Sequence, residues 1–192
     1  MFNDKCSLTD SVLDGTKTMT RRVSTDGKPK YEVGELVAIK QSYEAISRSH
    51  SYTDTDFVGN VIHPIDRRWL EELLDKYTDE CNDVADLFNL LGWTNKMFVK
   101  NELMPHHIQI TNVRQERLKA ISDEDCIAEG IKVGDFSNTC NKYYYDLHGD
   151  DPFHVTYNTP QRAFASLINR TSGKGTWDCN PMCYVYSFKL ID

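Results

Sequence analysis

The C-terminal segment 183–191 constrains the fold most, because its side chains alternate with the two-residue period of a β-strand. Every second position is aromatic or aliphatic: Tyr184, Tyr186, Phe188 and Leu190. Three further segments have strand character, at 36–43, 97–100 and 107–117. Segments of helical character lie between them. The sequence therefore predicts an α+β fold built on a small barrel or curled sheet.

Helical periodicity and helix-capping signals predict helices over 7–14, 69–77, 84–91, 122–129 and 159–171. Ser122 is suited to cap its helix, with Asp125 at the capping-box position. Thr159 and Pro160 form a typical helix start. Ser172-Gly173-Lys174-Gly175-Thr176 ends the last helix. It does not resemble a phosphate-binding P-loop, because it follows a helix where that motif follows a strand.

The length of 192 residues suits one domain, 1–192, with 40% hydrophobic and 27% charged residues as in ordinary globular proteins. No apolar run approaches the roughly 20 residues that cross a bilayer. The N-terminus lacks a basic region followed by an apolar one. These observations predict a cytoplasmic protein that does not enter membranes.

The cysteines and histidines do not indicate a metal or a cofactor. The chain is long enough to fold without disulfides, so the six cysteines are expected to be reduced. Cys179 and Cys183 lack a second pair at zinc-site spacing. His106 and His107 are adjacent in a predicted strand and would point to opposite faces. We expect neither a metal site nor a cofactor.

The net charge of −7 is concentrated in one segment, because residues 48–92 hold four basic and ten acidic side chains. This segment interrupts two regions of strand character and contains two predicted helices, as an inserted acidic helical pair would. Its apolar stripes could dock on the host barrel, or form a lid or a surface for a partner protein. Residues 132–158, rich in Asn, Tyr, Asp and Gly, are predicted as a second, polar excursion.

The stretch 15–22 is chemically distinctive: Gly15-Thr16-Lys17-Thr18-Met19-Thr20-Arg21-Arg22. A glycine suited to the left-handed end of a helix is followed by a lysine, hydroxyls and a pair of arginines. It buries little apolar surface, which indicates a chemical use.

Three stretches together resemble the ASCH family, whose fold is a β-barrel similar to the RNA-binding PUA domain. The first is Gly15-x-Lys17-Thr18-x-Thr20-x-Arg22. The second runs from Val113-Arg114-x-Glu116-Arg117-Leu118 through Ile121-Ser122-Asp123-Glu124-Asp125 to Ala128-Glu129-Gly130. The third is Trp177-Asp178-x-Asn180-Pro181 before the aromatic strand. The last two look like the phage and prophage branch. The resemblance covers most of the chain outside 48–92 and 132–158.

The resemblance implies recognition of RNA, or of a modified nucleoside or nucleotide, in a cleft of a PUA-like barrel with flanking helices. A small bacterial relative hydrolyses the acetyl amide of acetylated cytidine with a Lys, a Thr three residues later and a Glu near the end of a later helix. Lys17, Thr20 and Glu129 match those positions and are the predicted catalytic residues. Other members of the family are described as nucleic-acid binders or ribonucleases.

Amide hydrolysis would assign each predicted residue a role. Thr20 would supply the nucleophilic oxygen or position a water, and Lys17 would accept its proton. That role requires a lysine pKa lowered by burial or by a cation such as Arg21 or Arg22. Glu129 would bind the cytosine edge or return a proton to the leaving amine. Because residues three apart in a strand point to opposite faces, Lys17 and Thr20 would have to lie in a turn or bulge.

Two other functions stay open. The same cleft could bind RNA without turnover, through basic residues that include Arg22, Arg114, Arg117 and Lys119. The predicted substrate-binding residues are Arg21, Arg22, Arg114 and Trp177, and Trp93, Trp177 and Tyr143–Tyr145 offer faces for base stacking. Alternatively the chain could be a phage-type interaction protein acting through the acidic segment 48–92. Lys17 and Glu129 could also be ordinary residues at helix ends.

Overall fold

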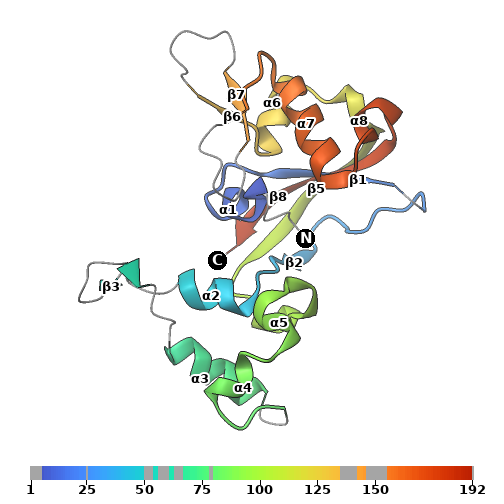
Figure 1. The fold of residues 1–192 in the computed structure, drawn as a ribbon. Coiled ribbons are helices and arrows are strands. Elements are labelled where there is room, and N and C mark those ends of the chain that lie inside the picture. The colour runs from blue at the N-terminus through green and yellow to red at the C-terminus, as the bar shows by residue number, and fades with distance from the viewer. Residues whose placement is uncertain are drawn as a thin grey trace. The chain divides into compact units, whose positions relative to one another are not determined.

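The computed structural model describes residues 6–24, 26–49, 54–55, 61–62, 67–77, 80–134, 142–145 and 155–191. The chain divides into two compact units (Figure 1). The first unit combines Met1–Ile39 with His106–Asp192, and the second unit is Lys40–Pro105. The second unit thus contains the whole of the acidic segment 48–92.

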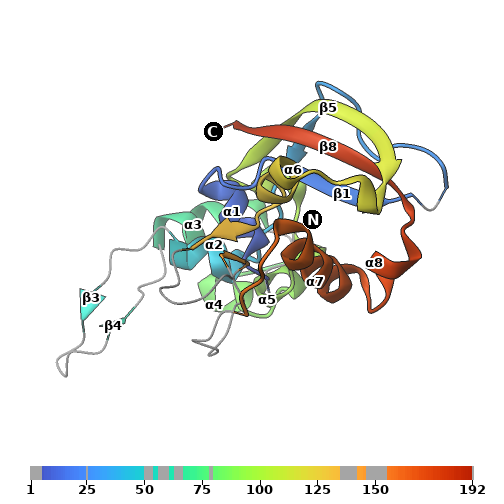
Figure 2. The same ribbon diagram turned by 90° about the horizontal axis from the view of Figure 1, so that it is seen from above.

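The first unit is built on a four-stranded antiparallel sheet with the order β1-β8-β5-β2. The strands are β1 (Met19–Val23), β2 (Leu36–Ala38), β5 (His107–Arg117) and β8 (Met182–Ile191). The register between β5 and β8 shifts between Ile110 and Asn112, and such a bulge bends a strand and increases its twist. Figure 2 shows the resulting curvature. The α+β prediction with a curled sheet is confirmed as a half-barrel; a PUA-like barrel stays a prediction.

The predicted strands at 107–117 and 183–191 are confirmed, and both form the centre of the sheet. The strand predicted at 36–43 is shorter, because β2 ends at Ala38. The chain then enters α2 (Tyr43–Ser49) in the second unit.

The strand predicted at 97–100 is wrong. Lys96–Phe98 forms the 3₁₀ helix η2 instead. The side chain of Asn95 caps this turn by accepting a hydrogen bond from the Met97 amide at 3.0 Å. This local cap offers the backbone a partner that a strand would have to find elsewhere.

Helices of the first unit lie on one side of the sheet (Figures 1 and 2), where α6 (Asp123–Ala128), α7 (Pro160–Ser172) and α8 (Thr176–Cys179) are neighbours. The other elements are α1 (Leu8–Leu13), the 3₁₀ helix η4 (Leu118–Ala120) and the short pair β6 (Lys132–Val133) and β7 (Tyr143–Tyr144). The caps predicted at Ser122 and Thr159 are confirmed, since the Ser122 side chain accepts from the Asp125 amide and the Thr159 side chain from the Arg162 amide.

The core of the first unit joins the sheet to α1, α6 and α7. Its fully buried members include Val12, Ile110, Leu118, Cys126, Phe164 and Cys183. Burial of this apolar surface is the main force that holds α7 to the sheet. The arrangement fixes α6 and α8 beside β1, which is where the charged residues gather.

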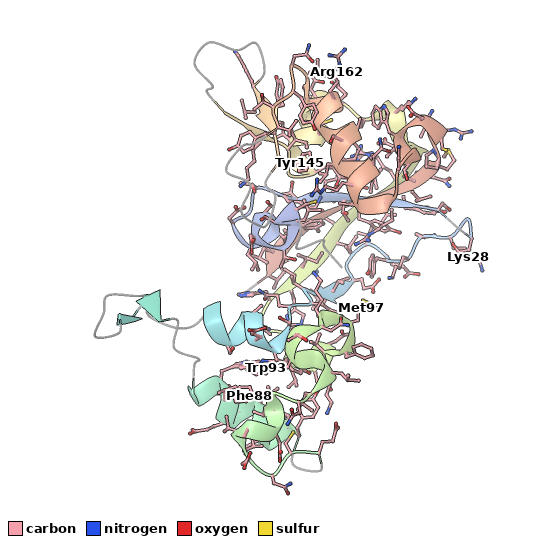
Figure 3. All side chains as sticks on the ribbon, viewed as in Figure 1. Lys28, Phe88, Trp93, Met97, Tyr145 and Arg162 are labelled. Atoms are coloured by element: carbon pink, nitrogen blue, oxygen red, sulfur yellow. The ribbon has the colours of Figure 1, made fainter. Side chains whose placement is uncertain are left out.

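The second unit has its own buried side chains. Its elements are α2, β3 (Asp54–Thr55), β4 (Val61–Ile62), α3 (Arg67–Lys76), α4 (Val84–Leu87), α5 (Leu91–Thr94), η2 and η3 (Asn101–Leu103). The hydroxyls of Tyr43 and Tyr77 are hydrogen-bonded at 2.6 Å, and Leu73 and Leu87 are buried. Trp93 lies beside Phe88, with ring centroids 4.6 Å apart (Figure 3).

No helix in the described part of the chain combines the length and apolar character needed to cross a membrane. The described cysteines, Cys6, Cys81, Cys126, Cys179 and Cys183, are free thiols, and Cys140 lies outside the described residues. The cytoplasmic location stays a prediction.

Candidate functional site

Lys17 lies in the loop between α1 and β1 and is almost completely buried, at 2% exposure. Its Nζ donates to the backbone oxygen of Glu129 at 2.7 Å and to Oε2 of the same residue at 2.8 Å. Gly130 follows with a φ of 100°, which ends the α6 region closely against this lysine. A Cβ at Gly130 would lie 3.6 Å from Lys17 Cδ. The structure thus brings together two of the predicted catalytic residues.

Arg21 joins this pair from β1, with its side chain 1% exposed. Its Nη1 donates to Glu129 Oε1 at 3.2 Å. Its Nη2 donates to Glu116 Oε1 at 2.5 Å and to Asp125 Oδ2 at 2.6 Å. The partners come from β5 and α6, so one guanidinium ties these two elements to β1.

Arg114 completes the set from β5, donating to Asp125 Oδ2 and, at 3.2 Å from Nε, to Glu116 Oε2. We call the six residues the ion-pair network: Lys17, Arg21, Arg114, Glu116, Asp125 and Glu129. Three cations face three carboxylates, which balances the charge. This balance gives each buried charge a counter-charge. A buried charge without one would lower the free energy of unfolding by several kcal/mol.

The network perturbs the ionisation of its buried cations. Burial lowers the pKa of Lys17, the attraction of Glu129 opposes this, and the positive charges of Arg22 and Arg21 add to the lowering. Burial alone would also lower the pKa of Arg21, but Glu129, Glu116 and Asp125 raise it. The direction of this shift is the one that a proton-accepting Lys17 would need.

Thr20 does not join this pair. It lies in β1 between the buried Met19 and Arg21, and it is paired with Tyr186 of β8. Because successive strand residues point to opposite faces, its side chain lies on the other face of the sheet from Arg21. The structure gathers Lys17, Glu129 and Arg21, and places the predicted nucleophile apart from them.

A pocket of about 500 Å³ opens beside the network. Its lining residues are Arg21, Arg22, Val23, Ser172, Lys174, Gly175, Thr176, Cys179 and Pro181. Three of these carry a positive charge, and none is acidic. Arg21 belongs both to the pocket lining and to the network, so the two are adjacent.

The loop that forms one wall of the pocket is held by local hydrogen bonds. Gly173 and Gly175 have φ values of 107° and 88°, which only glycine adopts readily. Thr176 Oγ1 donates to the backbone oxygens of Ser172 at 3.1 Å and Gly173 at 2.7 Å. The Trp177 amide donates to Asn169 Oδ1 at 3.0 Å. These bonds fix the loop and α8 to the end of α7.

Trp177, a predicted substrate-binding residue, is half-buried and packs edge-on against Phe164, with ring centroids 6.2 Å apart. Lys119 Nζ lies 5.8 Å from the centre of its ring. Arg117 Nη1 donates to the Asn180 backbone oxygen at 3.3 Å. Lys119 and Arg117 thus lie beside α8, and Arg22 and Lys174 line the pocket that α8 borders. We call these four residues the basic rim: Arg22, Arg117, Lys119 and Lys174.

Comparisons of the chain with protein-family models, with curated proteins and with solved structures give no match. The resemblance to the ASCH family therefore stays a prediction carried by the three motifs.

Two features of the site were missed from the sequence. The loop Ser172–Thr176 does not match the P-loop motif, but its lysine between two glycines is the signal in the sequence for a basic pocket wall. The ionic partners of Arg21 lie 95 to 108 residues further along the chain than Arg21 itself, so no local pattern links them to it.

Within the described residues, no group of three or more His, Cys, Asp or Glu side chains is placed to hold a metal ion.

Proposed function

We propose that the first unit binds RNA or a nucleotide at the pocket and the basic rim. The observation that carries this proposal is the pocket of about 500 Å³ whose lining includes three basic side chains and no acidic one. The chain as a whole has a net charge of −7, so attraction of a phosphate must come from such a local concentration of positive charge.

The size of the pocket favours a small organic ligand over a bare ion. Ligand pockets commonly span about 300 to 1,000 Å³, and this one lies within that range. Val23 and Pro181 provide apolar contact area beside the cations. A nucleotide matches this combination, because it joins an anionic phosphate to a less polar sugar and base.

Not every predicted contact is equally available to a ligand. Arg21 and Arg114 are engaged with carboxylates of the network. Lys174, Lys119 and Arg117 are exposed, and the carboxylate of Asp178, which lies 4.0 Å from Lys119 Nζ, is exposed as well. The binding energy is therefore assigned to the basic rim, with Arg21 as the inner wall of the pocket.

Salt dependence of RNA binding tests the proposal. Binding of a fluorescent single-stranded RNA of about 12 nucleotides is measured by anisotropy between about 50 and 200 mM salt, a range over which phosphate contacts change affinity strongly. If all four rim cations contact phosphates, the slope of log K against log salt is about −3, at about −0.7 per contact. Lys119→Ala should weaken binding and make the slope less negative by about 0.7.

The matched control is Lys189→Ala, which removes an exposed lysine of β8 that does not line the pocket. This variant should bind RNA as the unchanged protein does. An affinity that does not change with salt, or equal losses in Lys119→Ala and Lys189→Ala, would contradict binding at the rim.

One observation favours a second candidate function, hydrolysis of an acylated cytidine. Lys17 and Glu129, which match two catalytic positions of the small bacterial relative, form an ion pair at 2.8 Å, and burial lowers the pKa of the lysine. In this reaction water cleaves the amide C–N bond and yields acetate and cytidine. Arg21, which contacts Glu129 and lines the pocket, would lie on the substrate's side of the pair.

Acetate release from acetylated cytidine tests this second candidate. The unchanged protein should release acetate, and Lys17→Met should abolish release while far-UV circular dichroism and RNA affinity are retained. Absence of release across a panel of acylated nucleosides would remove the hydrolase and leave the binding proposal intact.

A further inference from the structure

The cations of the pocket differ in how far the protein already neutralises them. Arg21 contacts Glu116, Asp125 and Glu129. Lys174 is exposed and has no ion pair or hydrogen bond to any side chain that the structure describes. Its positive charge therefore stands without an internal counter-charge on the pocket wall.

We infer that the pocket holds a phosphate monoester, the terminal phosphate of a nucleotide or of an RNA end, with Lys174 and Arg22 as its cationic contacts. This inference rests on the proposed function and names the chemical group that the pocket selects.

Charge favours a monoester over the phosphodiester links inside a nucleic acid chain. A phosphate monoester carries a charge of about −1.5 to −2 at pH 7, whereas each internal phosphate carries −1. The pocket lining supplies three basic side chains, Arg21, Arg22 and Lys174, and no carboxylate to repel the ligand. Because the attraction scales with the charge of the ligand, the same lining attracts a dianion about twice as strongly as a monoanion.

The donors of the pocket also match three terminal oxygens. The guanidinium of Arg22 and the ammonium of Lys174 both donate several hydrogen bonds. The exposed hydroxyl of Ser172 lies on the same wall, next to Thr176, whose hydroxyl already donates to backbone oxygens. Such charge-assisted bonds are roughly twice as strong as bonds between neutral groups.

Arg21 adds a positioning contribution. Its Nη atoms are held by carboxylates, while its Nε is buried and has no hydrogen-bond acceptor among the described residues. A buried donor without an acceptor is unfavourable. An anionic oxygen at the inner end of the pocket would give this donor a partner.

The test compares 12-nucleotide RNAs of one sequence with a 5′-phosphate, a 3′-phosphate or only hydroxyl ends, a length chosen to match the salt experiment. Competition by a nucleoside monophosphate and by inorganic phosphate distinguishes a free nucleotide from an RNA end. The variants are Lys174→Met and, as the matched control, Lys189→Met. A terminal phosphate is expected to raise affinity about tenfold, the effect of one strong charge-assisted contact.

In Lys174→Met the gain in affinity from a terminal phosphate should fall below about threefold, while Lys189→Met should retain the full gain. Equal affinity for phosphorylated and hydroxyl-ended RNA would overturn the inference and leave RNA binding standing. If no RNA binds but calorimetry detects a nucleoside monophosphate that Lys174→Met no longer binds, the inference holds for a free nucleotide and RNA binding is overturned. If neither ligand binds, both proposals fail.

Discussion

Replacing Glu129 with glutamine removes one negative charge from the most buried part of the ion-pair network while keeping the size of the side chain. In the unchanged protein Glu129 is paired with Lys17 at 2.8 Å and with Arg21 at 3.2 Å, and both cations are at most 5% exposed. Glu129→Gln therefore leaves three cations facing two carboxylates. Removing one partner of a buried ion pair lowers the free energy of unfolding by about 3–5 kcal/mol, and we expect a loss of this size in Glu129→Gln.

Replacing Lys17, the partner of Glu129, should lower the free energy of unfolding by less than Glu129→Gln does. In Lys17→Met the carboxylate of Glu129 keeps its contact with Arg21, so no carboxylate is left without a cation. The double variant Lys17→Met/Glu129→Gln restores a balance of two cations and two carboxylates. Its loss of unfolding free energy should therefore be smaller than the sum of the two single losses, by more than about 1 kcal/mol.

The assay must report on the first unit alone, because a chain of two units need not unfold in one step. Hydrogen exchange measured by mass spectrometry in increasing urea, on peptides from β5 and β8, supplies this reading. The reasoning is refuted if the free energy of unfolding of Glu129→Gln lies within about 1 kcal/mol of that of the unchanged protein. It is also refuted if the loss in the double variant equals the sum of the losses in Lys17→Met and Glu129→Gln.

Other predictions follow from the same contacts. Burial raises the pKa of Cys126 to about 12 and that of Cys183 to about 11, from 9.0 in the unfolded chain. Above pH 9.0 the unfolded state therefore binds fewer protons, and the free energy of unfolding should fall as pH rises. The lowered pKa of Lys17 acts in the opposite direction up to 10.5, so Lys17→Met should steepen this fall; a flat profile under reducing conditions would contradict it. Gly130→Ala, at a φ of 100°, should lower the free energy of unfolding by about 1–2 kcal/mol. Gly27→Ala, at a φ of 74° that lies closer to the left-handed region open to other residues, should lower it less in the same urea titration, and equal losses would contradict this dependence on φ.

The sequence predicts the central strands well, for a physical reason. β8 and β5 carry side chains that alternate between faces, and this period is a property of the local chain. Caps such as Ser122 are equally local. β1 was missed because Thr20, Arg21 and Arg22 carry no apolar alternation. Arg21 is buried only because distant carboxylates neutralise it, and a local pattern cannot show that.

The candidate site was predicted in part. The contact between Lys17 and Glu129 is present, whereas Thr20 lies on the other face of the sheet. The motifs identified residues of unusual chemistry but not the direction of each side chain, which depends on where the strand begins. The wall formed by Lys174 depends on how α7 ends and α8 starts, and only the folded chain brings that loop beside Arg22.

Backbone amide shifts of isotope-labelled protein, followed by NMR during titration with single-stranded RNA, test ligand binding at the pocket most directly. We predict that the largest shift changes fall on residues 21–23 and 172–180, with smaller changes at Arg117 and Lys119, and that Lys174→Met reduces them. Saturating RNA that leaves these residues unchanged, or that shifts only residues of the second unit, would contradict this assignment.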